Sequence, residues 1–206
     1  MKINESGRSM IEMLGVLAII GVLSVGGIAG YSKAMSKYRV NKTVDQVSRI
    51  IANTRILYGA QRTYGDLDKG IIDKAKLFPQ EMGKYDNAVN PFAGSVTMVK
   101  GDRFKADDNK AVMLTYSGIP EDACIDIASI DWGTGAGGGL LAFGIDKTGE
   151  GGAAATTVGT NIGKYYAGGT CPDGAICAGE GDTVMSVQDA TDACVGENNT
   201  LYFKFY

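Results

Sequence analysis

Histidine is absent from all 206 residues of the sequence, which also holds only one tryptophan and four prolines. A serine or cysteine nucleophile activated by an imidazole therefore cannot be built, and zinc sites that rely on histidine are excluded. The four cysteines show no Cys-x-x-Cys spacing, and no glycine cluster shows the Walker A pattern. We expect a protein that is not an enzyme and that holds no cofactor and no metal.

Charge of either sign is modest, but it is unevenly placed. The chain has 20 Lys and Arg against 23 Asp and Glu, a net charge of −3. Residues 31–62 carry seven cations against Asp45 alone, a net charge of +6, and residues 1–30 are neutral, so residues 63–206 carry −9. A basic stalk and an acidic head can attract other copies of the chain, although a solvated helix face and a soluble head explain the same distribution. We predict no nucleic-acid partner.

Glycine is plentiful, with 30 residues, and the stretch Gly133–Gly138 fits the pattern GxGxxG. A lone match without a strand–turn–helix context is a weak signal, and we expect no nucleotide site there. Asp102, Asp107 and Asp108 lack the spacing of an EF-hand loop and are expected to form a solvated acidic turn. Most of the stretch Gly133–Gly181 is expected to form loops.

A long apolar run near the N-terminus is the strongest feature of the sequence. No charged residue occurs from Met13 to Tyr31, and nineteen helical residues can cross a hydrocarbon core of roughly 30 Å. A secretory signal peptide cut after Ala29, or a plain single-span anchor, would carry a similar run. Neither explains Glu12 at the head of the run, because a carboxylate in apolar surroundings is costly unless it is paired.

Helical periodicity continues beyond the apolar run. Apolar residues recur at helical spacing from Val40 to Leu57, and charged residues stand between them. A glycine follows Tyr58, which is a typical stop signal. We therefore expect one helix from Ser9 to Tyr58, apolar all round in its first half and one-sided in its second.

The remaining elements are expected to be short. Pro120 followed by two acids predicts a helix to about Ser129, and Ser186 with Asp189 forms a capping box for a helix that runs toward Cys194. Together these elements predict an α+β fold with a mainly antiparallel sheet on the long helix. The expected strands are Ser95–Lys100, Ala111–Tyr116, Leu140–Ile145 and Leu201–Tyr206, and a further short helix is expected around Leu67–Leu77.

The four cysteines are Cys124, Cys171, Cys177 and Cys194, and an even number in an exported chain indicates two disulfides. Three pairings are open. Cys171 and Cys177 enclose a tight turn and could form a disulfide with each other. That pairing would leave Cys124 to bond with Cys194. That long loop would stabilise the fold by roughly 4 kcal/mol on the chain-entropy account. A zinc site is the weaker alternative, because no histidine is present.

Residues 7–12, Gly-Arg-Ser-Met-Ile-Glu, together with the apolar run resemble the class III signal of type IV pilins and their relatives. In that family a prepilin peptidase cuts after the glycine of a short leader, and glutamate is the fifth mature residue. The resemblance implies a cut after Gly7 and methylation of the new amino group on Arg8. It also implies that Glu12 pairs with the amino terminus of a neighbouring subunit and sets its register in a filament.

Further stretches resemble the type IVb pilins, most closely the thin-pilus pilins of conjugative plasmids. The resemblance implies the pilin fold, with a long-range disulfide from Cys124 to Cys194 that bounds a variable D-region exposed on the pilus. The second bridge, Cys171–Cys177, would lie inside that region. The stretches that carry the resemblance are Val44–Gly59, Asn90–Gly94, Thr115–Pro120 with Cys124, and the late Cys194.

The expected function is that of a structural subunit that polymerises into an extracellular type IV pilus. The expected organisation is a leader (residues 1–7), a long helix (8–58, with 8–31 in the membrane or filament core) and a globular pilin head (59–206). The expected partners are identical subunits, the inner membrane before assembly, a prepilin peptidase and the pilus assembly machinery. Two alternatives stay open, a pseudopilin of a type II secretion system and a membrane-anchored periplasmic protein that never polymerises. The sequence does not separate conjugation, adhesion, motility and DNA uptake.

Overall fold

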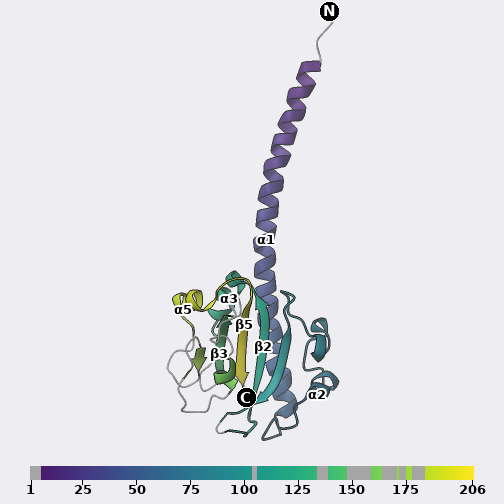
Figure 1. Cartoon of the computed structure of the whole chain (residues 1–206). Coiled ribbons are helices and arrows are strands. Elements are labelled where there is room, and N and C mark those ends of the chain that lie inside the picture. The colour runs from purple at the N-terminus through teal and green to yellow at the C-terminus, as the bar shows by residue number, and fades with distance from the viewer. Residues whose placement is uncertain are drawn as a thin grey trace, which may run out of the picture. The chain divides into compact units, whose positions relative to one another are not determined.

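The computed structural model describes residues 6–103, 106–133, 139–147, 159–163, 171, 175–177 and 184–206. The chain divides into two compact units, Met1–Tyr38 and Arg39–Tyr206. In addition to the elements named below, residues 159–163 form a short helical segment. The named elements (Figure 1) are the helices α1 (Ser6–Tyr58), α2 (Lys69–Lys74), α3 (Glu121–Ala128) and α5 (Val187–Ala193), the 3-10 helices η1 (Gln80–Met82) and η2 (Tyr85–Asn87), and the strands β1 (Val96–Gly101), β2 (Ala111–Ile119), β3 (Leu140–Lys147), β4 (Ala175–Cys177) and β5 (Asn199–Phe205).

The first unit consists of the N-terminal part of α1. No proline interrupts this part, and its leucine and alanine residues favour a helix. Every residue from Met10 to Ala34 is exposed. A helix that is apolar on all sides needs a cover, and this unit does not provide one.

In the second unit one side of α1 is buried in the core and the other side is exposed. Val40, Val47 and Ile50 are at most 5% exposed and belong to the main hydrophobic core, whereas Ile56 is 82% exposed. The buried Thr54 donates its hydroxyl hydrogen bond to the main-chain carbonyl of Ile50 at 2.7 Å. That bond removes the cost of burying an unpaired hydroxyl on the core-facing side of the helix.

A five-stranded antiparallel sheet packs on this part of α1, in the strand order β1-β2-β5-β3-β4. The last strand in sequence, β5, lies between β2 and β3 (Figure 1). Its side chains alternate between two faces. Leu201, Phe203 and Phe205 join the main core with α1, and Tyr202 joins a smaller cluster on the opposite face.

The smaller cluster is covered by the helical residues 159–163. Ile162 is fully buried there, and the Lys204 ammonium donates a hydrogen bond to the main-chain carbonyl of Gly163 at 3.3 Å. A Cβ atom at Gly159 would collide with the ring of Tyr202. Glycine is therefore needed where this segment approaches the sheet.

Asn90 ties the segment between α1 and β1 to the sheet. It is 4% exposed, and its side-chain amide donates to the main-chain carbonyl of Ser117 at 2.7 Å. Its side-chain oxygen accepts hydrogen bonds from the main-chain N–H groups of Phe92 and Gly94. A Cβ atom on Gly94 would collide with the carbonyl of Ser117, so the close approach of these two backbone segments requires glycine.

The same segment covers the free edge of β1. The main-chain N–H of Val96 donates to the carbonyl of Ala88 at 3.0 Å, and the Tyr85 hydroxyl donates to the carbonyl of Met98 at 3.0 Å. Two of the main-chain groups that β1 turns away from β2 are therefore already bonded within the chain.

The short helices begin as the sequence predicts. α3 starts directly after Pro120 and carries Glu121 and Asp122 in its first turn, where negative charge is favourable. α5 starts after Ser186, whose hydroxyl oxygen accepts from the main-chain N–H of Asp189 at 3.1 Å. The predicted helix around residues 67–77 is shorter and spans Lys69–Lys74.

The predicted α+β fold, with a long N-terminal helix and an antiparallel sheet, is confirmed. β2 runs three residues beyond the predicted end, to Ile119, and β5 starts two residues earlier than predicted, at Asn199. The expectation of loops in most of Gly133–Gly181 is wrong in two places, at β4 and at residues 159–163, which are too short to show a periodicity. The GxGxxG match at 133–138 lies almost wholly outside the described residues.

Candidate functional site

Glu12 lies on α1 within an exposed apolar surface. The neighbouring residues Ile11 and Met13 are 74% and 63% exposed, and Glu12 is exposed as well. Gly7 and Arg8, which flank the predicted cut, lie in the first turns of the same helix, and their side chains are outside the described part of the chain. Arg8 and Glu12 are four residues apart, so one helical turn separates them.

α1 is the one helix in the described part of the chain that is long and apolar enough to cross a membrane. Its most apolar 18-residue window has a mean hydropathy of 2.2, and no residue of that window is buried. Exposed apolar surface of this extent is unstable in water, so it needs lipid or other apolar helices around it. The exposed residues include Leu14, Leu17, Ile20, Leu23 and Ile28.

Five glycines lie in this apolar surface, although no contact within the chain requires a residue without a side chain at these positions. A Cβ atom built on each of them meets no other atom within 4 Å. Each glycine lowers the stability of an isolated helix by about 1 kcal/mol relative to alanine. Small residues of this kind allow close approach between helices, as in the GxxxG motif that two of them form at Gly26 and Gly30. The five are Gly15, Gly21, Gly26, Gly27 and Gly30.

Both disulfides lie in the second unit. Cys124, in α3, is bonded to Cys194, which follows α5 directly, and both are buried with their Cα atoms 5.8 Å apart. Cys171 is bonded to Cys177 in β4, with the Cα atoms 5.7 Å apart. Of the three pairings that the sequence allows, the structure holds this one, and all four cysteines are used. The first bridge joins α3 to the end of α5, and its two cysteines are 70 residues apart in sequence.

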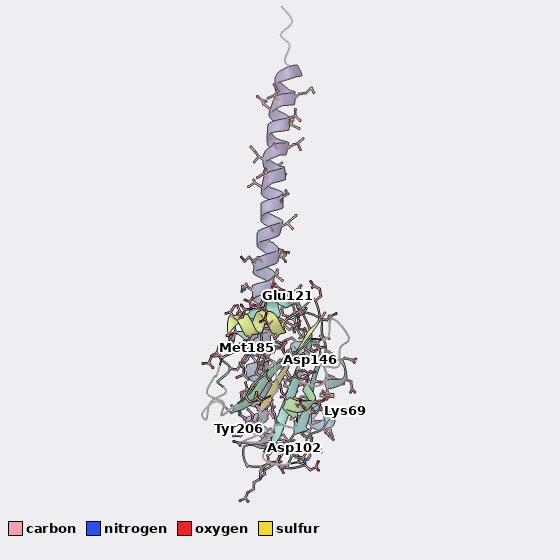
Figure 2. The ribbon with its side chains drawn as sticks, turned by 60° about the vertical axis from the view of Figure 1, so that its left-hand side comes forward. Lys69, Asp102, Glu121, Asp146, Met185 and Tyr206 are labelled. Atoms are coloured by element: carbon pink, nitrogen blue, oxygen red, sulfur yellow. A yellow bond between two sulfur atoms is a disulfide. The ribbon has the colours of Figure 1, made fainter. Side chains whose placement is uncertain are left out.

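A second contact strengthens the junction between α3 and α5. The carboxylate of Glu121 accepts a hydrogen bond from the main-chain N–H of Gly196 at 3.3 Å. Figure 2 shows Glu121 and Met185 toward one end of the second unit, and Asp102 and Tyr206 toward the other. The two helices and their disulfide therefore form one end of the head.

Two ionisable groups, the buried Lys204 and the half-buried Tyr202, lie on the sheet face that residues 159–163 cover. Burial lowers the pKa of Lys204 to about 8, against the nearby carboxylates of Asp102 and Asp108, which raise it. The Tyr202 hydroxyl donates to Asp146 at 3.0 Å, and burial followed by this carboxylate raises the pKa of Tyr202. The Lys204 bond ties the covering segment to the sheet, whereas the Tyr202 bond joins β5 to β3. Across the described residues no cluster of Cys, Asp and Glu has the arrangement of a metal site.

The family model described as PilS N terminal matches residues 37–205 of the chain. The chain belongs to this family. The match begins after the apolar run, so it covers the second unit, the two disulfides and the sheet. The resemblance to type IVb pilins that the sequence showed is thereby confirmed, and the chain is a type IV pilin.

Individual relatives agree with the family. Over 150 residues this pilin is 27% identical to the major structural subunit of bundle-forming pilus from Escherichia coli O127:H6 (strain E2348/69 / EPEC), which covers 71% of this chain and 73% of the relative. Over 126 residues it is 25% identical to the toxin coregulated pilin of Vibrio cholerae, with 60% of this chain and 56% of the relative covered. Its fold is similar to the crystal structure of TcpA, a type IV pilin from the El Tor biotype of Vibrio cholerae. That similarity has a TM-score of 0.54 at 17% identity and covers 82% of this chain and 99% of the other.

The structure separates the residues that the sequence singled out into two groups. Gly7, Arg8 and Glu12 share the first turns of α1, whereas the four cysteines lie in the second unit. The sequence analysis did not single out Lys204 or the Tyr202–Asp146 bond. A lysine between aromatic residues in the predicted last strand was the available signal, because strict alternation would have placed it on the face opposite Phe203.

Proposed function

We propose that this pilin is cut after Gly7 and polymerises into an extracellular type IV pilus through residues 8–31, with residues 59–206 as the outer head. The observation that carries the proposal is an exposed apolar helix with a single acid, Glu12, near its start. The two relatives, a major structural subunit of bundle-forming pilus and a toxin coregulated pilin, support the same function. In such a filament, identical helices would supply the cover that the first unit does not provide for itself.

Glu12 acts as the register mark of the filament. The cut after Gly7 creates a positive amino group on Arg8, and an incoming subunit places this group against Glu12 of its neighbour. An ion pair in a medium of low dielectric is strong, and a charge left without its partner there costs several kcal/mol, on the order of 3–5. A subunit that stops one helical turn too early or too late is therefore disfavoured.

Before assembly the pilin spans the inner membrane once through α1. A prepilin peptidase removes residues 1–7 and methylates the amino group of Arg8, and the pilus assembly machinery then moves the subunit into the filament. The two disulfides support a route out of the cytoplasm, because such bonds form in oxidising compartments. The partners of the mature chain are further copies of itself.

The decisive experiment replaces Glu12 and follows assembly. Glu12→Gln keeps the size of the side chain and removes its charge, so we expect membrane insertion and head folding to persist while surface filaments are lost. Ile11→Val is the matched control, because it changes the adjacent residue without a charge, and it should give filaments at the normal level. Electron microscopy and the amount of sheared fibre report the outcome. Normal filaments from Glu12→Gln would refute the role of Glu12.

Intact-mass spectrometry of the purified chain tests the processing steps separately. We expect the mass of residues 8–206 plus one methyl group, less the four hydrogens lost in two disulfides. A chain that retains residues 1–7 in native filaments would contradict the proposed pairing of amino group and Glu12, because that amino group would not exist.

A further inference from the structure

A cavity of about 330 Å³ opens in the second unit where α1 ends. Figure 2 shows Tyr206, one of its lining residues, at the end of the head that lies away from Glu121. The volume is at the lower limit of cavities that hold small molecules, roughly 300–1,000 Å³. The lining side chains that matter here are Arg62, Arg103 and Lys110 together with Tyr58, Tyr64 and Tyr206.

The walls of this cavity are fixed by the fold. The main-chain N–H of Tyr64 donates to the carbonyl of Asn109 at 2.7 Å, and the Thr63 hydroxyl donates to the same carbonyl at 2.9 Å. The rings of Tyr58 and Tyr64 pack with their centroids 4.8 Å apart. The guanidinium group of Arg55 donates to the main-chain carbonyl of Tyr206 at 3.0 Å. Three separate stretches of chain are thus joined around the cavity before any ligand arrives.

Among the described residues, the charged side chains that line the cavity are positive, although residues 63–206 carry a net charge of −9. Two acids on the same loop accept hydrogen bonds from its main chain. Asp108 accepts from the N–H groups of Arg103 and Lys110, at 2.8 and 3.0 Å, and Asp102 accepts from the N–H of Asn109 at 3.1 Å.

The positive charges of Arg55 and Arg103 also act on Tyr64, which lines the cavity. Burial raises the pKa of the Tyr64 hydroxyl, and the guanidinium groups of Arg55 and Arg103 oppose that rise. Tyr58 has acidic neighbours, and its pKa is raised by burial first, then by a hydrogen bond with Asp66 and by the charges of Asp66 and Asp68. The charged groups that act on Tyr64 are therefore two cations, although burial outweighs them, and the side of the cavity with Arg62, Arg103 and Lys110 is the side that would attract an anion.

We infer that this cavity binds a saccharide unit that carries an acidic group, a carboxylate or a phosphate. Arginine side chains bind both groups through paired N–H bonds, and the tyrosine and threonine hydroxyls and the Gln61 amide match the hydroxyl groups of a sugar ring. This inference does not depend on polymerisation, and it concerns the head of the pilin alone.

The aromatic residues favour a sugar over a nucleobase. Stacking of bases needs open ring faces. The Arg103 guanidinium already lies over the ring of Tyr206, 3.2 Å from its centroid. Tyr58 and Tyr64 are only 5% and 8% exposed and pack against each other. Their contribution to a ligand is therefore a ring edge or a hydroxyl.

The test compares two sugars that differ only in the acidic group. Saturation-transfer NMR and titration calorimetry are run with the full-length pilin in detergent micelles, using galacturonic acid against galactose. We expect a Kd on the order of 1 mM for galacturonic acid and at least about tenfold weaker binding of galactose. Equal binding of the two sugars would overturn the inference, and so would inorganic phosphate that binds as tightly as glucose 6-phosphate, because the sugar ring would then contribute nothing.

Variants locate the site. Arg62→Gln and Lys110→Gln should each weaken galacturonic acid binding about fivefold, because each removes a charge-assisted contact. Lys84→Gln is the matched control, an exposed lysine outside the lining, and it should bind as the unchanged chain does. An unchanged melting temperature shows that each variant folds. Equal weakening by Lys84→Gln, or displacement of the sugar by a thymidine oligonucleotide at lower concentration, would overturn the inference.

Discussion

Lys204 carries an amino group into the middle of the sheet. It is fully buried in the central strand β5, where its ammonium donates to the main-chain carbonyl of Gly163. Desolvation of the charged form explains why the pKa of this lysine falls to about 8, since the carboxylates of Asp102 and Asp108 act in the opposite direction. The residue therefore makes the stability of the head depend on pH.

The sign of this dependence follows from proton counts. Between pH 8 and about 10.5 the unfolded chain keeps the proton on Lys204 while the folded chain loses it, so the free energy of unfolding rises with pH. We expect the unchanged pilin to gain about 1 kcal/mol per pH unit relative to Lys204→Met between pH 8.5 and 9.5. Urea unfolding at several pH values measures the difference. The window stops below pH 10 because the raised pKa of Tyr58, about 12, acts in the opposite sense above it. Parallel pH profiles would contradict the prediction.

Individual residues also mark the limit of what the sequence reveals. The Asn90–Gly94 stretch was recognised by resemblance, but the bond from the Asn90 amide to the carbonyl of Ser117 joins residues 27 positions apart. Such a contact depends on how two loops meet, and no local pattern contains it. Glu12 is the opposite case, because an acid beside an apolar run is visible in the sequence alone.

The elements were predictable where their signals are local. The long helix, four strands and the capping box of Ser186 all follow from spacing and capping residues over short windows. The order of the sheet does not, because the last strand pairs with β2 and β3, and that pairing is set by packing on α1. β4 has three residues in a glycine-rich stretch, so no alternation marks it, and β3 and the Cys171–Cys177 bond hold it in place.

The two disulfides should contribute unequally to stability. On the chain-entropy account the Cys124–Cys194 bridge, with a separation of 70 residues, is worth about 4 kcal/mol, and the Cys171–Cys177 bridge, with a separation of 6, about 2 kcal/mol. We expect the double serine variant at 124 and 194 to lose more free energy of unfolding than the one at 171 and 177. Urea unfolding of both in detergent measures this. Equal losses would show that native-state contacts, not loop length, set their values.

At the scale of the whole molecule, the exposed glycines of α1 are places where helices of other copies could pack closely. Since no atom of the chain lies within 4 Å of a Cβ at Gly26 or Gly30, larger residues there should leave the single chain undisturbed. If these glycines allow close helix packing in the filament, their replacement should harm assembly alone.

We therefore expect Gly26→Leu and Gly30→Leu to insert into the membrane with an unchanged head melting temperature, while sheared fibre falls at least about tenfold. Ile28→Leu keeps the side-chain volume in the same stretch and should assemble normally. Comparison of fibre yield with the membrane pool of the subunit separates assembly from expression. Normal yield from both glycine variants would show that helix contacts in the fibre do not use this face.

The covered edge of β1 limits how the head domains of two subunits can contact each other. With Val96 and Met98 already bonded to Ala88 and Tyr85, a neighbour cannot continue the sheet by adding a strand at these positions. At this edge of the sheet, neighbouring heads are therefore left to touch through side chains, which can separate without unfolding either molecule. Contacts made at the β1 edge can therefore break while both sheets stay intact.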